Sequence, residues 1–413
     1  MLGSAPLPYR FHVGEPSSDW AAMPARPGVA VFESPDGRPT LIATTADLRE
    51  LARARLGPAP TDTPPTKATD LRSVTTVLHA TTVGSAFEAD LVYLGLVRRL
   101  MPDTHRAITE RWQGWFVHID PAERFPRWTK VCTTALGVDT SAADLAVLAR
   151  SGGLLLGPVR DKHAAGKLME VLDDLFDLCR FHNLLVQSPR ATACAYKEMG
   201  KCPAPCDGSE PLESYRSRVA EAARCACDPA AWIARVQAAM HDAAAGQRFE
   251  EAARLKRLID AGTPLTAAPC RHLCELSSLA YTVVTRSERA GWARVFIATA
   301  AGVEPLADVR ADAPELAFGE LARISADAIE ARRSLTFDAA HADTLGLLCR
   351  WLYLPPRSTI EFIPGPAPTP DGLRAAAAGV LRSSRTRAKA SGAQADTSDV
   401  PEQTVEPLET QGP

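Results

Sequence analysis

The chain has 413 residues, of which 46% are hydrophobic and 23% are charged. This balance excludes wholesale disorder and leaves room for two or three domains. The formal net charge is −3, which excludes a globally positive surface of the nucleic-acid-binding kind, although a local basic patch is enough for phosphate contacts. No apolar run reaches the roughly 18 residues of a membrane helix, and the N-terminus lacks a signal-peptide pattern. We therefore expect a cytoplasmic protein with no membrane partner.

Residues 1–26 are rich in proline and predict an irregular lead-in. The next block, 27–105, predicts a ββαβα unit. Its expected elements are strands at 28–32, 40–42 and near 73–83, a helix that begins with Thr45 as its N-cap, and a helix over 85–100. The Pro- and Thr-rich segment 59–69 predicts an exposed loop inserted in this unit.

The rest of the chain predicts three further regions and a tail, so that the whole is of the α/β (α+β) class. Residues 106–229 contain a strand at 115–119, a helix over 164–181 and a cysteine-bearing loop. Residues 230–262 predict a helical hairpin that turns at Gly246. The last regions are a separate α/β domain over 270–364, with strands at 292–300 and 358–364 and helices at 315–333 and 338–353, and a disordered tail over 385–413.

Ten cysteines in a reducing compartment need a reason other than disulfides. Four of them fall within 28 residues, at Cys179, Cys194, Cys202 and Cys206. Thiolates suit iron–sulfur clusters and zinc, but the absence of paired CxxC knuckles weakens the zinc interpretation. The alternative is that these are ordinary buried cysteines. For a second group, Cys225, Cys227, Cys270 and Cys274, partial burial or a backup role in ligation is favoured over a metal site of its own. The spacing around Cys270 predicts a core helix.

The cysteine loop CAYKEMGKCPAPC closely resembles that of the UvrC and Cho nucleotide-excision-repair proteins. Residues 153–158 are similar to the family's YFGPF turn, and residues 243–261 resemble its UVR motif, so the resemblance covers about 27–262. It implies a structural four-iron four-sulfur cluster on the four clustered cysteines, with zinc as the alternative. It also implies damaged duplex DNA as substrate and a UvrB-like protein as partner through residues 230–262.

The block 27–105 resembles a GIY-YIG endonuclease domain, which implies metal-assisted phosphodiester hydrolysis. The family's two tyrosines and its arginine fall on Ala30, Leu41 and Leu51, which can neither activate water nor bind phosphate. Only the metal-binding glutamate survives, as Glu88, and it would hold Mg²⁺ or Mn²⁺ if the site worked. Glu88 can equally be a carboxylate that stabilises a helix start. The nearby Arg49 and Arg55 are candidates for partial rescue of the phosphate contact.

A basic stretch follows this block, and its arginines could contact phosphates. They are Arg98, Arg99, Arg106 and Arg111. Trp112, Trp115 and Trp128 lie in the same basic stretch, which continues to Lys130. Such residues pack in a core more often than they stack on bases. Three hypotheses result: a UvrC/Cho-like DNA-binding repair protein with impaired incision, an active endonuclease with relocated catalytic groups, or a non-DNA scaffold protein.

Overall fold

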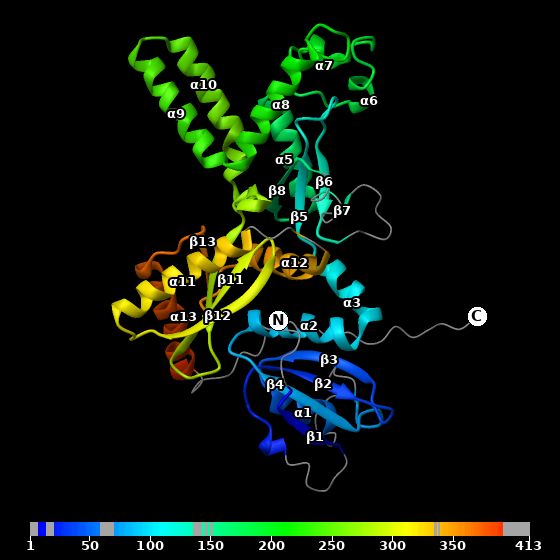
Figure 1. Ribbon diagram of the computed structural model, residues 1–413, viewed down its shortest axis with the longest axis vertical. Coiled ribbons are helices and arrows are strands. Elements are labelled where there is room, and N and C mark those ends of the chain that lie inside the picture. Colours follow the sequence, from blue (N-terminus) through cyan, green and yellow to red (C-terminus); the bar gives the residue numbers. More distant parts are fainter. Residues whose placement is uncertain are drawn as a thin grey trace, which may run out of the picture.

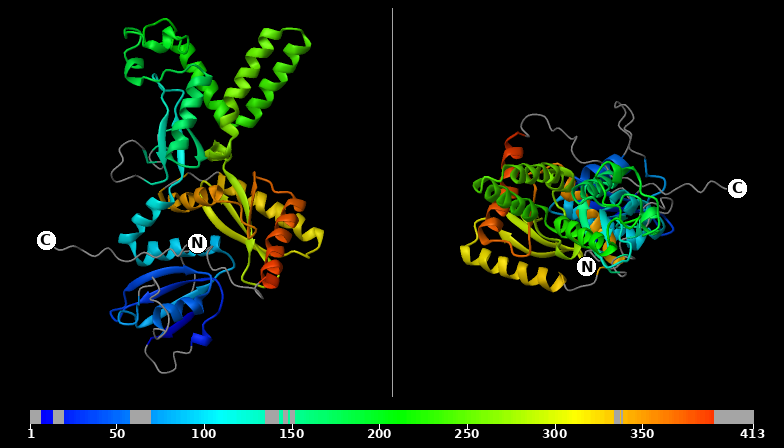
Figure 2. Two further views of the ribbon diagram at one scale, coloured as in Figure 1. Left: turned by 180° about the vertical axis from the view of Figure 1, so that it is seen from behind. Right: turned by 90° about the horizontal axis from the view of Figure 1, so that it is seen from above.

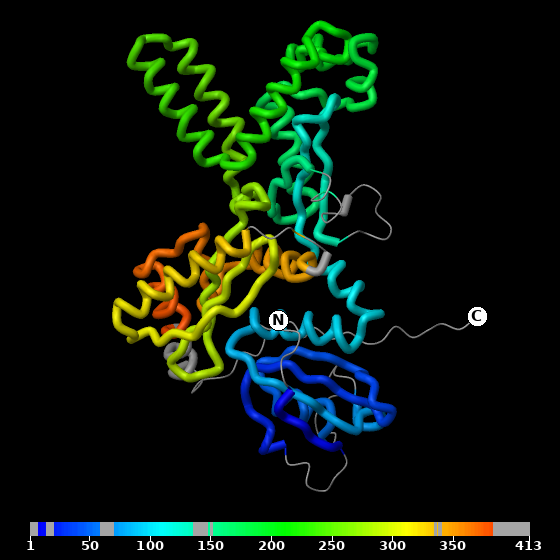
Figure 3. Tube along the Cα trace, in the orientation of Figure 1, coloured from blue at the N-terminus to red at the C-terminus, as the bar shows by residue number. Residues whose placement is uncertain are grey.

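The computed structural model describes residues 7–13, 20–57, 70–134, 143–144, 148, 152–333, 337 and 339–390. The predicted loop at 59–69 lies outside these ranges, as do residues 391–413 of the predicted tail. Figure 1 shows three parts arranged along the long axis of the molecule. We call them the N-terminal block, the middle module and the C-terminal unit, and Figure 3 traces the chain through them.

The N-terminal block is a four-stranded antiparallel sheet with one helix on each face, and it contains the predicted ββαβα order. The strand order is β1-β4-β2-β3. The elements are β1 (Tyr9–His12), η2 (Trp20–Ala22), β2 (Gly28–Glu33), β3 (Pro39–Thr45), α1 (Leu48–Leu56), β4 (Val77–Thr82) and α2 (Ala86–Leu100). Alternate residues of β2 face opposite ways, so Ala30 and Phe32 pack toward α1 while Val29 and Val31 pack toward α2.

The predicted N-cap of α1 is wrong by two residues. Thr45 is the last residue of β3, and its Oγ1 accepts a hydrogen bond from the Asp47 amide at 3.1 Å. The cap is Asp47, whose carboxylate accepts from the Glu50 amide at 3.0 Å. The Asp47 carboxylate accepts a hydrogen bond from a free amide in the first turn of the helix. Thr45 instead stabilises the turn that precedes the helix.

The middle module is built on a five-stranded sheet of order β7-β6-β5-β8-β9. Its strands are β5 (Trp115–Ile119), β6 (Thr129–Cys132), β7 (Ala143–Asp144), β8 (Leu154–Val159) and β9 (Cys274–Glu275). Two short helices, α3 (Pro102–Thr109) and η3 (Glu110–Trp112), lead into it from α2. Its own helices are α5 (Lys162–Leu175), α6 (His182–Leu185), α7 (Ala195–Glu198) and α8 (Leu212–Cys227).

Two predictions for this module are corrected. The helix expected over 164–181 ends at Leu175, because Asp177 has φ 48° and the Leu178 amide bonds back to the Asp173 carbonyl at 2.9 Å. Residues around Cys270 do not form a core helix. They form a single 3-10 turn and then β9, which pairs with β8 at Gly157 and Leu156.

The predicted helical hairpin is confirmed as α9 (Pro229–Ala245) and α10 (Phe249–Gly262). Gly246 follows α9, and Gln247, with φ 58°, turns the chain into α10. The hairpin and the cysteine-bearing end of the middle module project from the same end of the molecule and diverge like the arms of a V (Figures 1 and 2). Three 3-10 turns, η4 (Thr263–Thr266), η5 (Ala268–Cys270) and η6 (Leu276–Ser278), lead back toward the C-terminal unit.

The C-terminal unit has its own antiparallel sheet of order β12-β11-β10-β13, as the α/β prediction requires. Its elements are β10 (Ala280–Arg286), β11 (Trp292–Thr299), β12 (Gly302–Arg310), α11 (Glu315–Arg333), α12 (Ala339–Tyr353), β13 (Ile360–Pro364) and α13 (Pro370–Ala390). Helices α11 and α13 cover one face of this sheet. Helix α13 was not predicted, and it makes residues 385–390 helical rather than part of a tail.

The other face of the C-terminal sheet packs on α12 and on α2 of the N-terminal block. One hydrophobic cluster therefore runs without a break from Val31 through α2 to Phe296 and Trp351. The C-terminal unit has a sheet of its own but shares its core with the N-terminal block. Among the described residues, every helix is too short or too polar to cross a membrane.

Candidate functional site

The three positions that the GIY-YIG resemblance aligns with catalytic residues are sealed in the core. Ala30, Leu41 and Leu51 are 1%, 3% and 7% exposed. All three belong to the apolar cluster between α1 and the sheet of the N-terminal block. Their side chains contact other hydrocarbon groups there, and this arrangement offers no polar atom to a phosphate or a water molecule.

Glu88 lies on the opposite side of that sheet, in the first turn of α2, and is 3% exposed. Its amide donates to the Ser85 hydroxyl at 3.1 Å, and its carboxylate accepts from the Gly84 amide at 2.8 Å. This reciprocal pattern is close to a capping box, in which Ser and Glu three residues apart satisfy the free amides of a helix start. The sequence pointed to this structural role as one of two alternatives for Glu88.

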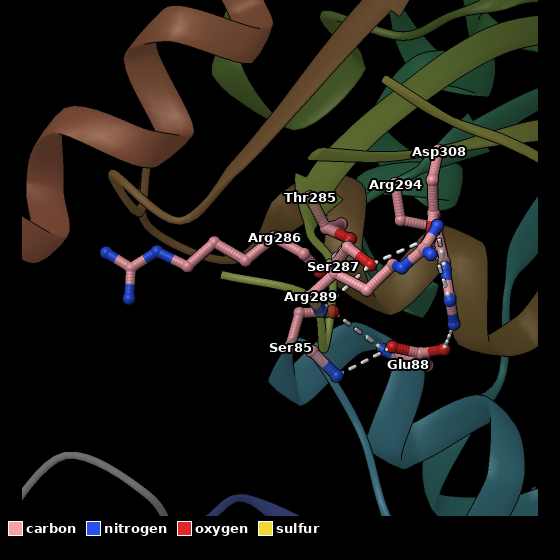
Figure 4. Close-up of polar contacts among 9 residues, drawn as sticks. Ser85, Glu88, Thr285, Arg286, Ser287, Arg289, Arg294 and Asp308 are labelled. Atoms are coloured by element: carbon pink, nitrogen blue, oxygen red, sulfur yellow. Dashed lines mark hydrogen bonds and ion pairs between the residues drawn. The ribbon is translucent and has the colours of Figure 1, made fainter. Parts of the chain in front are cut away.

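The second oxygen of the Glu88 carboxylate forms an ion pair with Arg294 of β11 (Figure 4). The same guanidinium bonds Asp308 of β12 at 2.8 Å, and Asp308 also accepts from the Ser287 hydroxyl at 2.9 Å. Burial raises the pKa of Glu88, against the opposing effects of the Gly84 amide and Arg294. Burial also acts on Asp308, but the hydrogen bonds from Arg294 and Ser287 outweigh it and lower the pKa of that carboxyl.

The backbone around this network is packed too tightly to leave space. A Cβ atom at Gly84 would lie 2.2 Å from the Arg286 carbonyl oxygen and 2.7 Å from the Glu288 nitrogen, so only glycine permits the contact. Arg26 adds a hydrogen bond to the Glu288 carbonyl. The start of α2 is thus fastened to the turn between β10 and β11, and the Glu88 carboxylate is surrounded by protein groups.

Sequence reasoning missed Arg294, Ser287 and Asp308 as neighbours of Glu88. Arg294 is 206 positions away along the chain, and no local pattern connects the two residues. The candidates for rescue are engaged elsewhere: Arg49 donates to the carbonyls of Met23 at 2.8 Å and Ala21 at 2.9 Å, and Arg55 is buried. The structure does not bring either arginine to Glu88.

The four predicted DNA-binding arginines lie on the surface in one stretch of chain. Arg98 and Arg99 are in the last turn of α2, Arg106 is in α3 and Arg111 is in η3, and all four are exposed. Arg106 forms an exposed ion pair with Glu110 at 3.2 Å. The neighbouring tryptophans do not line this surface. Trp112 and Trp115 are buried in the core, and the Trp128 indole donates to Asp173 at 3.1 Å.

The four clustered cysteines are brought together at the end of the middle module. Cys202 and Cys206 are buried, and Cys179 and Cys194 are half-buried. A hydrogen bond joins the Cys179 and Cys202 side chains, and Cys206 lies close enough to both Cys202 and Cys194 for their charges to interact. Cys179 lies in the loop beyond α5, and the left-handed Ala204, with φ 59°, turns the chain between Cys202 and Cys206.

The middle module is similar in sequence to a known protein family. Residues 119–225 match the family model of the middle domain of the UvrC/Cho excinuclease. The chain is UvrC/Cho-like.

Curated relatives agree with this assignment and are all UvrABC system protein C. That of Trichlorobacter lovleyi is 26% identical over 58% of this chain and 37% of its own length. That of Caldanaerobacter subterraneus is 23% identical over 57% of this chain and 36% of its own length, and that of Deinococcus radiodurans is 33% identical over 27% and 18%. The chain therefore matches at most little more than a third of the length of these relatives. No solved structure is significantly similar.

The fit of the cysteine loop to an iron–sulfur cluster depends on the arrangement and the chemistry of its thiols. Among the described residues, no group of three or more His, Cys, Asp or Glu side chains is arranged as a metal site. The donor set nevertheless has the right chemistry. All four residues carry thiols, which such a cluster accepts as ligands. The hydrogen bonds from Cys179 and from the Ala204 backbone, with the charge of Arg218, lower the pKa of Cys202 and favour its thiolate. The same hydrogen bond raises the pKa of Cys179, and burial raises that of Cys206.

The second cysteine group behaves differently. Burial is the main cause that raises the pKa of all four thiols, to about 12 for Cys225 and Cys274 and about 11 for Cys227 and Cys270. The Cys274 thiol donates to the Gly157 carbonyl at 3.4 Å. These four cysteines are therefore protonated packing residues, in line with the burial prediction.

Proposed function

We propose that this UvrC/Cho-like chain is a DNA-binding protein of nucleotide excision repair that has lost efficient incision. The observation that supports impairment most directly is the burial of Ala30, Leu41 and Leu51 in one apolar cluster. The Glu88 carboxylate is the remaining candidate metal ligand, and it is shared between the Gly84 amide and Arg294. An active endonuclease with relocated groups would need a new polar set near Glu88, and Arg49 and Arg55 do not supply it.

DNA binding is proposed to begin at the exposed arginines of α2, α3 and η3. Phosphate contacts of this kind need no base readout and depend steeply on salt. This dependence separates a DNA-binding protein from the scaffold alternative, in which no counterions are released when the chain meets DNA.

The test uses the full chain, damaged duplex DNA, Mg²⁺ and a UvrB-like protein. We expect no nicked product above the level of a Glu88→Gln variant. We also expect binding whose affinity falls linearly on a log–log plot against salt. Changing Arg98, Arg99, Arg106 and Arg111 to Ala should reduce the magnitude of that slope by about 3.6, which is about 0.9 for each of the four lost contacts. Arg310→Ala and Arg323→Ala should leave the slope unchanged. Mg²⁺-dependent nicking by the unmodified chain alone would contradict the impairment, and a flat salt response would favour the scaffold.

We further propose that Cys179, Cys194, Cys202 and Cys206 hold a four-iron four-sulfur cluster, with zinc as the alternative occupant. The cluster would supply cross-linking of the loop to the region after α5 rather than redox turnover. The proposal is supported by the hydrogen bond between Cys179 and Cys202, by the proximity of Cys206 to Cys202 and Cys194, and by the lowered pKa of Cys202.

Replacing Cys202 by Ala is expected to abolish metal retention, because it removes the proposed ligand that is hydrogen-bonded to Cys179. The measurement is anaerobic purification with iron, sulfide and zinc analysis and an absorbance spectrum. Cys270→Ala is the matched control, since Cys270 is buried to the same extent as Cys202 but belongs to the second group. Equal iron in both variants would refute the ligand assignment, and zinc in the unmodified chain would replace the cluster by a four-thiolate zinc site.

The helical hairpin is proposed to dock on a UvrB-like protein. Phe249, at the start of α10, is 69% exposed, whereas Leu255 on the same helix is buried. Arg254, Lys256 and Arg257 are exposed along α10. An exposed aromatic side chain with neighbouring cations is a suitable anchor for a partner hairpin.

A further inference from the structure

The end of the middle module carries an unusual share of exposed apolar surface. Three of the seven large hydrophobic side chains that are exposed among the described residues lie between positions 180 and 201. They are Phe181, Val186 and Met199, which are 42%, 43% and 61% exposed. We call residues 180–201 the tip. Helices α6 and α7 place it at the end of the molecule farthest from the N-terminal block (Figure 1).

Within the tip, Phe181 packs beside a second aromatic ring that carries a cation on its face. The Phe181 ring lies 6.0 Å from the Tyr196 ring at an angle of 54°, and the Arg180 guanidinium lies 4.4 Å from the centre of the Tyr196 ring. Met199 follows Tyr196 by three residues, on the same turn. Gly200, with φ 68°, allows the Lys201 amide to bond the Tyr196 carbonyl at 2.9 Å, which closes this turn.

The charge of the tip decides what kind of molecule suits it. Four cations, Arg180, Arg190, Lys197 and Lys201, stand against a single carboxylate, Glu198. Lys197 is paired with Asp207 and Arg180 with Asp174, so the exposed Arg190 and Lys201 contribute most to the positive surface. Aromatic rings beside cations are the combination that binds nucleic acid through base stacking and phosphate contacts. An intact duplex hides the faces of its bases, whereas a distorted duplex exposes them.

We propose that the tip binds unpaired bases of distorted DNA through Phe181 and Met199, with Lys201 and Arg190 on the phosphates. The proposal rests on the proposed DNA-binding function and adds its substrate class, namely DNA with unstacked bases. It assigns duplex binding to the arginines of α2, α3 and η3 and recognition of the distortion to the tip.

The experiment measures fluorescence anisotropy of the full chain with three labelled probes: an intact duplex, the same duplex with a central unpaired bubble, and the single strand. The unmodified chain should prefer the bubble over the duplex. Phe181→Ala and Met199→Ser should each reduce affinity for the bubble by about tenfold and leave affinity for the duplex unchanged. Leu316→Ser is the matched control, because Leu316 is 84% exposed on α11, outside the tip.

The outcomes distinguish the two proposals. Absence of binding to all three probes overturns the DNA-binding function itself. Binding without preference for the bubble overturns only the role of the tip, and so does a preference that survives both substitutions. The role of the tip is also overturned if the two substitutions weaken binding to a UvrB-like protein and leave binding to the bubble unchanged. If Phe181→Ala also lowers metal content or thermal stability, the Lys201→Glu variant replaces it as the test of the tip, because this change alters the charge of an exposed side chain. An unchanged preference of Lys201→Glu for the bubble would then count against the tip.

Discussion

Replacing Phe87 by alanine should lower the free energy of unfolding by about 3–5 kcal/mol, the cost of a large cavity in a packed core. Phe87 is 1% exposed in α2. Its ring lies 5.5 Å from those of Phe296 and Trp351 and 6.1 Å from that of Phe362, each nearly perpendicular to it. Edge-to-face pairs of this kind add to the value of the buried area. Three of these four rings belong to the C-terminal unit, so the loss falls on the joint between two parts of the chain.

The measurement is urea denaturation followed by circular dichroism and by tryptophan fluorescence. Because the core is shared, we expect the transition of the N-terminal block and that of the C-terminal unit to shift together to lower urea. Phe249→Ala is the control for loss of an aromatic ring, since Phe249 is largely exposed and its removal should change little. Two separate transitions, of which only one moves, would contradict a shared core.

Replacing Arg294 by methionine should lower the free energy of unfolding by about 3 kcal/mol, at the lower end for a buried ion pair because a quarter of the Arg294 side chain is exposed. The change leaves Glu88 buried without its counterion, and desolvation then raises the pKa of Glu88 further. When the pKa of a carboxyl is higher in the folded state than in the unfolded state, the free energy of unfolding falls as the pH rises through the folded-state pKa. The variant should therefore recover stability on acidification toward the ordinary pKa of glutamate.

Stability of the Arg294→Met variant would be measured by urea denaturation at neutral pH and at a mildly acidic pH. Glu88→Gln in the same chain should restore part of the loss, because the amide needs no counterion. Arg310→Ala removes an exposed ion pair with Asp312 and should have no measurable effect on stability. If Arg294→Met resembled Arg310→Ala, the ion pair with Glu88 would not fasten the two parts together.

Local elements were predictable because their signals are local. The stripe of Ala89, Val92 and Leu96 predicts the helix α2, and the alternation in β2 predicts its strand. The surroundings of α2 were not predictable in the same way, since its second partner is a sheet some 200 residues later. One signal was present: Phe87, Leu91 and Leu94 make the helix apolar on the remaining side as well, and a helix that is apolar all round is buried on all sides.

The site was predictable in part for the same reason. The four cysteines were found because they are close in sequence, and the structure keeps them close. The end of α5 before Cys179 depends on a left-handed aspartate at 177, a position that non-glycine residues seldom adopt. The role of Glu88 was visible as one of two alternatives, since Ser85 three residues earlier is the capping signature. Its pairing with Arg294 depends on tertiary contacts alone.

The apolar cluster around Leu51 has a consequence for how such a protein can change. Burial of one leucine side chain contributes about 1.5–3 kcal/mol, whereas an arginine or a phenol at such a position would need polar company that costs stability. Active sites are commonly held at the expense of stability. Ala30, Leu41 and Leu51 instead place only hydrocarbon in this cluster. Introducing a tyrosine at Ala30 or Leu41, or an arginine at Leu51, would therefore weaken the fold, whatever activity such a change is meant to add.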